Sequence, residues 1–118
     1  MATKEQLYDD GMFDFSMGEF DAAIDKFKQA LALDANFFDA NHALGMAYYR
    51  AGKIDEAIAT GLRSLEIKPN DQLAHTSLSM YYVKKGMKPE AEHHGAQARV
   101  AGWKEELKKP KGDPPQER

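Results

Sequence analysis

The sequence repeats at an interval of 34 residues, and this period constrains the fold more than any other feature. When the chain is shifted by that interval, five columns align across three successive copies. One column holds Met12, Met46 and Met80, and the others hold small residues: Gly18, Gly52 and Gly86; Ala23, Ala57 and Ala91; Gly11, Gly45 and Ser79; Ala30, Ser64 and Ala98. Because one register holds through three copies, we expect three equivalent units that stack side by side.

Each copy is predicted to fold as two helices joined by a tight turn. In the second copy, apolar residues recur at helical spacing over 38–51, and a second amphipathic run covers about 53–67. Gly52, between the two runs, is a typical C-terminal stop. Pro69 bars the second helix from continuing, and Asn70 is expected to cap the next helix. The pattern therefore indicates an all-α protein built from helix hairpins.

Small residues at the repeated positions indicate where the two helices of a hairpin touch. Antiparallel helices approach closely only where side chains are short, so Gly45 is expected to face Ala57 across the second hairpin. The same reasoning pairs Gly11 with Ala23, and Ser79 with Ala91.

The second copy resembles the tetratricopeptide repeat, a helix–turn–helix unit with the pattern W-x₂-L-G-x₂-Y followed by A, F and P. The matching residues are Leu44, Gly45, Tyr48, Ala57 and Pro69 in the second copy; Leu78, Ser79, Tyr82 and Ala91 in the third; and Gly11, Ala23 and Phe27 in the first. The resemblance covers roughly residues 3–101. It implies a right-handed superhelical array of three antiparallel helix hairpins.

Two glycines depart from the family pattern inside the predicted second helices. Gly61 and Gly95 replace the aromatic residue that Phe27 supplies in the first copy. Each glycine costs about 1 kcal/mol relative to alanine inside a helix. Tyr48 and Tyr82 are the candidates to fill the space that the missing rings leave.

Both ends of the array are expected to be capped. Asp10 and Asp14 stand where the family pattern has Leu and Tyr, as expected of a terminal repeat without an upstream neighbour. After the third copy, Val100, Trp103 and Leu107 fall on one face of a further helix. We expect this C-terminal capping helix to cover the apolar edge of the last repeat. In the alternative interpretation, Trp103 and Val100 form a contact for self-association.

Composition is that of a soluble protein with one globular domain, expected over residues 1–109, and a disordered tail over residues 110–118. The net charge is −3, whereas nucleic-acid binding usually needs a strongly basic face. The sequence has no cysteine, no signal peptide and no apolar run long enough to span a bilayer. We therefore expect a cytoplasmic protein that binds neither nucleic acid nor membranes.

The resemblance also assigns a candidate site, because the first helix of each tetratricopeptide hairpin lines a concave groove. On a helix over 38–51, one broad sector must pack against neighbours, yet a second sector about 100° wide is also largely apolar. With the equivalent sectors of the other two first helices, it makes up the predicted peptide-binding groove: Tyr8, Met12, Phe15, Asp39, His42, Met46, Tyr49, Arg50, Leu73, Thr76, Met80, Val83 and Lys84.

Three methionines in a row suit a surface that moulds to an apolar partner. The alternative is that each methionine fills a gap between repeats. Arg50 and Lys84 are expected along one rim, either to meet an acidic group of the ligand or simply as solvated charges.

The leading hypothesis is a protein–protein interaction adaptor that binds a short apolar peptide or helix of a partner in this groove. The alternatives are a self-assembling scaffold and a chaperone for an aggregation-prone client. Some family members clamp the acidic tails of heat-shock chaperones, but the clamp positions here cannot donate charge-assisted hydrogen bonds to a carboxylate. These positions are Tyr8, Met12, Ala43, Leu73 and Ser77.

No catalytic centre, cofactor site or metal site is predicted. His93 and His94 are adjacent, so their side chains diverge by about 100° on a helix. His42 and His75 stand alone, without a partner for nucleophilic catalysis. Phosphate-cradling glycine loops, dinucleotide fingerprints and the G-x-S-x-G motif do not occur. The sequence thus predicts a non-enzymatic protein without a cofactor.

Overall fold

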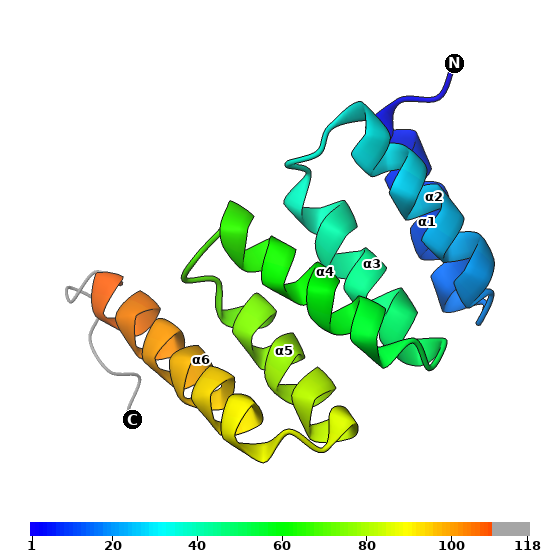
Figure 1. The fold of residues 1–118 in the computed structure, drawn as a ribbon. Helices are drawn as coiled ribbons and strands as arrows, with labels where there is room; N and C mark the ends of the chain where they lie inside the picture. The colour runs from blue at the N-terminus through cyan, green and yellow to red at the C-terminus, as the bar shows by residue number, and fades with distance from the viewer. Residues whose placement is uncertain (110–118) are drawn as a thin grey trace, which may run out of the picture.

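Residues 1–109 are described by a computed structural model, in which this part of the chain forms six α-helices and no strand. The helices are α1 (Lys4–Ser16), α2 (Phe20–Leu33), α3 (Phe38–Arg50), α4 (Ile54–Ile67), α5 (Gln72–Lys85) and α6 (Lys88–Lys108). They pair as three antiparallel hairpins that stack in sequence order, with α1 and α6 at opposite ends of the array (Figure 1). The predicted all-α hairpin array is confirmed, whereas the predicted tail at 110–118 lies outside the described residues. None of the six helices is both long and apolar enough to cross a membrane.

Glycine makes the turn within each hairpin possible. Gly18, Gly52 and Gly86 have φ angles of +79°, +82° and +85°, a left-handed region that residues with a Cβ rarely adopt. The predicted stop at Gly52 is therefore confirmed. The start of α5 differs from the prediction, because Asp71 rather than Asn70 directly precedes the helix. The Asp71 carboxylate accepts a hydrogen bond of 3.0 Å from the backbone N–H of Ala74.

Small residues do lie where helices touch, although their partners are not always the expected ones. A Cβ on Gly11 would lie 2.5 Å from the ring of Phe27, so this glycine makes room for Phe27 rather than for Ala23. Phe27 is fully buried as a result. In the third hairpin, the Ser79 hydroxyl donates a hydrogen bond of 2.7 Å to the carbonyl of Ala91, which agrees with the predicted pairing.

Gly45 also has neighbours other than the predicted one. A Cβ on Gly45 would lie 3.3 Å from the Tyr81 hydroxyl and 3.5 Å from Cγ2 of Thr60, so Ala57 is not its closest contact. Burial raises the pKa of Tyr81 to about 12. Ser77 lies close enough to oppose this rise, but the Tyr81 hydroxyl makes no hydrogen bond of acceptable geometry with the described residues. A buried hydroxyl without a partner lowers stability.

The space left by the missing ring at Gly61 is filled from the next hairpin. A Cβ on Gly61 would lie 2.8 Å from Cδ2 of Leu78 and 3.6 Å from the ring of Tyr81. Tyr48 and Tyr82, the expected substitutes, are not among the nearest neighbours of Gly61. The reason is that α5 presents Leu78 and Tyr81 toward α4.

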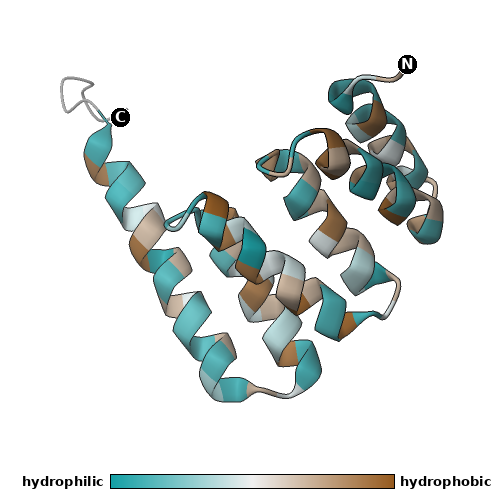
Figure 2. Ribbon diagram, turned by 45° about the horizontal axis from the view of Figure 1, so that its top comes forward, coloured by the Kyte–Doolittle hydropathy of each residue, from teal (hydrophilic) through white to brown (hydrophobic). Residues whose placement is uncertain are grey.

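The predicted C-terminal capping helix is the continuation of α6, which runs without a break from the third repeat. Ala91, Ala98 and Ala101 are the buried residues of α6, and the helix is otherwise largely hydrophilic (Figure 2). The face expected to cover the last repeat is exposed instead: Val100 at 41%, Trp103 at 63% and Leu107 at 52%. The prediction for this face was wrong because alanines, rather than large apolar side chains, turn toward α5.

Candidate functional site

The three first helices of the hairpins meet at one surface cavity of about 220 Å³. α3 lies in the middle and contacts both α1 and α5, so side chains from all three helices converge there. Seven residues of the predicted groove line the cavity: Tyr8, Met12 and Phe15 of α1, Asp39, His42 and Met46 of α3, and Leu73 of α5. The repeat period therefore brings together residues that are far apart in the sequence.

The methionines of the repeat column are open to solvent rather than sealed between helices. Met12 and Met80 are 39% and 40% exposed, and Met46 is half-buried. Met12 and Met46 both line the cavity, whereas Met80 lies outside it on α5. Leu73, which also lines the cavity, is 61% exposed. The first helices thus keep apolar side chains at the surface that their own core does not use.

Other predicted groove residues make different contacts. Tyr49 packs against Tyr81, with ring centroids 5.2 Å apart. The guanidinium of Arg50 lies over the rings of Phe15 and Phe20, at 5.5 Å and 4.9 Å from their centroids. Arg50 is therefore held by aromatic rings, a contact that neither of the two roles expected from the sequence, a partner for an acidic ligand group or a solvated rim charge, includes.

The predicted residues of α5 mostly lie away from the cavity. Thr76, Met80 and Lys84 are exposed on that helix. Val83 lines a different cavity, between α5 and α6. Val83 is 66% exposed, and its assignment to the groove of the first helices stays a prediction.

Two residues of the cavity were missed by the sequence argument, Phe38 and Ala43. The Phe38 ring stacks on His42 at a centroid distance of 5.9 Å, and the ammonium of Lys68 lies 4.4 Å from its centroid. Helical spacing could have identified both residues, since Phe38 is one turn before His42 and Ala43 is one turn after Asp39.

The electrostatics of the cavity are simple. Burial lowers the pKa of His42, and the nearby carboxylates of Asp71 and Asp39 only oppose that shift, so His42 is neutral at pH 7. Burial also raises the pKa of Tyr8, and the charge of Asp39 adds to the rise. Asp39 carries the one carboxyl group among the residues that line the cavity. Chemically, the cavity can hold an apolar side chain beside one acceptor of hydrogen bonds from N–H groups.

A histidine pair lies outside this cavity, in the third hairpin. Nδ1 of His75 lies 3.0 Å from Nδ1 of His94, and Nε2 of His75 lies 3.1 Å from the carbonyl of Pro69. Because a carbonyl only accepts, His75 donates from Nε2 and, when neutral, accepts at Nδ1 from His94. The expectation that His75 stands alone was wrong. Among residues 1–109 there is no group of three or more side chains that could hold a metal ion.

Comparison with known proteins decides the family. The Tetratricopeptide repeat family profile matches residues 14–81, which is more than half of the chain. The chain belongs to the tetratricopeptide repeat family. It is 30% identical over 66 residues to anaphase-promoting complex subunit 3 of Schizosaccharomyces pombe, a match that covers 56% of this chain and only 10% of that protein.

Solved tetratricopeptide repeat structures share the fold. MamA superposes with a TM-score of 0.86 and 31% identity, over 89% of this chain and 61% of that one. The second repeat domain of Spaghetti (RPAP3), bound to the HSP90 peptide SRMEEVD, has a TM-score of 0.80 and 18% identity, over 84% of this chain and 92% of that one. Three tetratricopeptide repeats account for the six helices, and the family supports a role in protein–protein interaction.

Proposed function

We propose that this protein is an adaptor that binds a short, largely apolar peptide or helix of a partner protein in the groove formed by α1, α3 and α5. The observation that carries this proposal is the open cavity where Met12 and Met46 stand beside aromatic rings. A surface of this kind usually marks a recognition site. Flexible, polarisable methionine side chains let such a site adapt to the shape of an apolar partner.

The size of the cavity favours a side chain over a free small molecule. Its volume is about 220 Å³, below the range of about 300–1,000 Å³ that is typical of small-molecule sites. One apolar side chain of a peptide fits such a space, and the exposed Leu73 extends the apolar surface beyond it. A backbone N–H or a basic group of the same peptide would find its partner in Asp39.

The acidic HSP90 peptide bound by the RPAP3 domain is not the ligand that this cavity favours. A carboxylate is held by charge-assisted hydrogen bonds from Lys, Arg or Asn. The cavity instead offers the negative charge of Asp39, and the nearby Arg50 is stacked on aromatic rings. We expect calorimetry to detect no micromolar binding of SRMEEVD, and binding at that level would refute this part of the proposal.

Peptide display tests the proposal without a known partner. The immobilised chain is expected to enrich apolar peptides from a random library. Met46→Glu and Met12→Glu should each weaken the selected peptides by at least about tenfold, because an unpaired carboxylate would be buried on binding. Met17→Glu is the matched control, since Met17 is 63% exposed and does not line the cavity.

The outcomes of that experiment separate the candidates. Unchanged helicity with lost binding in Met46→Glu supports the groove, and unchanged binding contradicts it. Enrichment of apolar peptides that share no common spacing would favour a chaperone for an aggregation-prone client.

Self-assembly is the second candidate function, and the exposure of Trp103 and Val100 favours it. Light scattering should then show a mass that rises with protein concentration, and Trp103→Ala should reduce this rise. A mass that stays monomeric would contradict self-assembly and leave the groove proposal untouched.

A further inference from the structure

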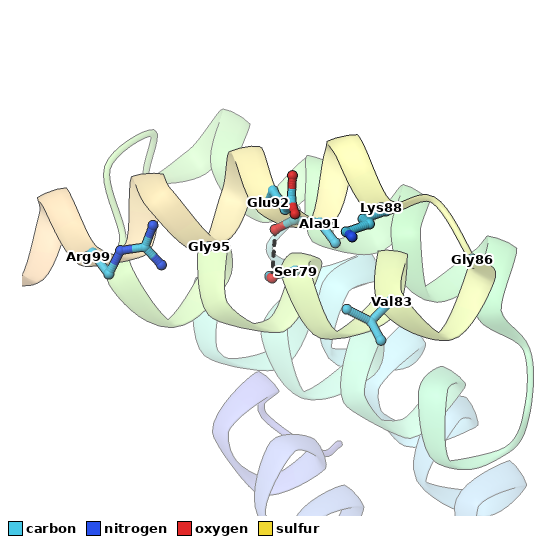
Figure 3. A pocket seen from close by; sticks show the side chains of 8 residues that line it. All are labelled: Ser79, Val83, Gly86, Lys88, Ala91, Glu92, Gly95 and Arg99. Carbon is cyan, nitrogen blue, oxygen red and sulfur yellow. Dashed lines mark hydrogen bonds between the residues drawn. The ribbon is translucent and has the colours of Figure 1, made fainter.

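A second cavity, of about 570 Å³, lies between α5 and α6. Ser79 and Val83 of α5 and Ala91 and Gly95 of α6 are among the residues that line it (Figure 3). The hydrogen bond from Ser79 to the carbonyl of Ala91 ties the two helices together at its floor. This cavity lies outside the proposed peptide groove, since apart from Val83 it shares no residue with the predicted site.

The cavity exists because the third repeat has no large side chain at the position of Gly95. In the first two repeats, this position is filled either by its own side chain or by side chains of the next hairpin. Phe27 fills this position in the first hairpin and is fully buried. At Gly61, the equivalent position of the second hairpin, Leu78 and Tyr81 of α5 fill the space. A Cβ on Gly95 would meet only the Ser79 hydroxyl at 3.3 Å and the Arg99 guanidinium at 3.9 Å. Within residues 1–109, no side chain of a following hairpin therefore fills the third position.

The face of α6 beside the cavity corresponds to the face of α4 that the next hairpin covers. Ile58 and Leu65 of α4 pack in the same cluster as Leu78 and Tyr81. Shifted by one repeat, Ile58 becomes Glu92 and Leu65 becomes Arg99. The same face thus carries charges around an apolar floor. Within residues 1–109, α6 packs on α5 alone.

At the opposite end of the array, α1 presents a complementary face. Two repeats before Leu78 and Tyr81 the chain has Asp10 and Phe13. At about 100° per residue, Gln6, Asp10 and Phe13 fall within a sector about 60° wide, away from the groove residues of α1. Met17, the C-cap residue directly after α1, continues this sector. Phe13 is 64% exposed and Met17 is 63% exposed. The sector thus presents the exposed aromatic ring of Phe13 beside the carboxyl group of Asp10.

We propose that α1 of a second copy of this chain docks on α6, with Asp10 and Phe13 in the places over Gly95 that Leu78 and Tyr81 occupy over Gly61. Phe13 then fills the cavity, and Asp10 faces Arg99. The register is the one that the protein already uses between α4 and α5. Neither Asp10 nor Arg99 makes an ion pair among the described residues. The contact joins unlike faces of the two copies, so it propagates into linear assemblies rather than closing as a two-fold dimer.

Charged caps alone do not account for these two faces. Terminal repeats often carry polar outer faces, and that would explain Asp10, Glu92 and Arg99. It would not explain why Phe13 is left exposed on one end face, or why an unfilled cavity lies in the other. One helix docked on another buries less than a standard interface, so the association should be weak and salt-sensitive.

Sedimentation equilibrium of the 118-residue chain tests the proposal, at low salt and up to about 1 mM, where weak contacts become populated. The average mass should rise with concentration. Asp10→Arg and Arg99→Asp should each lower the association constant at least about tenfold, because like charges then face each other. An equimolar mixture of these two variants should associate again, since each reversed face meets its complement. Asp25→Arg on α2 and Lys104→Asp on α6, which lie off both faces, are the matched controls.

A cavity-filling variant separates a lost interface from a damaged fold. Gly95→Met should occupy the hole from within, raise the melting temperature and weaken association at least about tenfold. Met46→Glu should associate like the wild type, so that failure of the groove proposal and failure of this one are distinguishable. A strictly monomeric wild type, no recovery in the mixture, or unchanged association of Gly95→Met would each overturn the proposal.

Discussion

The second and third hairpins carry glycine at the same position of the repeat, but their surroundings differ. Gly61 is covered by Leu78 and Tyr81 from the following hairpin, whereas Gly95 opens into a cavity of about 570 Å³. The residues beside the glycine also differ between the two second helices, α4 and α6. α4 has Ile58 and Leu65 where α6 has charged residues.

This difference shows that a hairpin in the array does not complete its own packing. Leu78 belongs to the third hairpin in sequence, yet it fills the space left by a glycine of the second. Stability of such an array depends on interfaces between neighbours as much as on the repeats themselves. α6 is the second helix of the third hairpin. Within residues 1–109 it therefore leaves uncovered the face that α4 buries against the following hairpin.

The largest effect is expected from emptying the filled position. Leu78 is fully buried, and Leu78→Ala should lower the free energy of unfolding by about 3 kcal/mol, as large-to-small core substitutions do. Val83→Ala, beside the open cavity, should change it by less than about 0.5 kcal/mol because Val83 is 66% exposed. Urea denaturation of both variants measures the contrast. Similar losses of stability in Leu78→Ala and Val83→Ala would contradict the claim that the position at Gly61 is filled and the one at Gly95 is open.

Adding a methyl group should have opposite signs at the two glycines. Gly61→Ala should destabilise by about 1 kcal/mol, since the clash with Leu78 outweighs the gain in helix propensity. At Gly95 the closest atom to the added Cβ among residues 1–109 would be the Ser79 hydroxyl, at 3.3 Å. This tight contact offsets part of the gain in helix propensity, so Gly95→Ala should stabilise by up to about 0.5 kcal/mol. Thermal melts of the pair give the answer, and the same sign in both would show that the neighbours of Gly61 give way freely.

Removing the unpaired hydroxyl of Tyr81 should raise the stability of the protein slightly. Tyr81→Phe keeps the ring against Gly61 and deletes the buried oxygen that has no acceptable partner among residues 1–109. We expect stability to rise by up to about 1 kcal/mol. A clear loss of stability in urea would mean that the hydroxyl has a hydrogen bond in solution, with Ser77 the nearest candidate.

Acid should weaken the third hairpin by the smallest amount. Burial, with the charges of His75 and His93, lowers the pKa of His94. The unfolded chain then binds more protons below about pH 6.5, so stability is complete above that pH and falls as pH drops toward the folded pKa. Melting temperatures between pH 7 and pH 5 should fall less in His94→Gln than in wild type. An equal fall would assign the effect to His42, whose pKa burial also lowers.

Features fixed by local geometry could be predicted from the sequence. Gly18, Gly52 and Gly86 end their helices because the turn needs a positive φ, and the helix expected over 38–51 runs from Phe38 to Arg50. Seven groove residues reach one cavity because the repeat period sets both helix phase and helix spacing.

Features that depend on a neighbouring helix could not be predicted. Leu78 and Tyr81 fill the space at Gly61 because of how α5 lies on α4, which residue spacing within one repeat does not contain. Arg50 reaches Phe20 across the first two hairpins for the same reason. The pairing of His75 with His94 joins α5 to α6 and has no signature in either helix alone.

Methyl resonances of labelled methionines test the central claim most directly, namely that the groove of the first helices and the Phe13 face of α1 are two separate binding surfaces. Met46 reports on the groove of the first helices, and Met17 reports on the end face of α1. Adding a display-selected apolar peptide to dilute protein should shift Met46 and leave Met17 unchanged, whereas raising the protein concentration alone should shift Met17 and leave Met46 unchanged. If the peptide moved Met17 and not Met46, or if neither titration moved its assigned methyl group, the account would be contradicted.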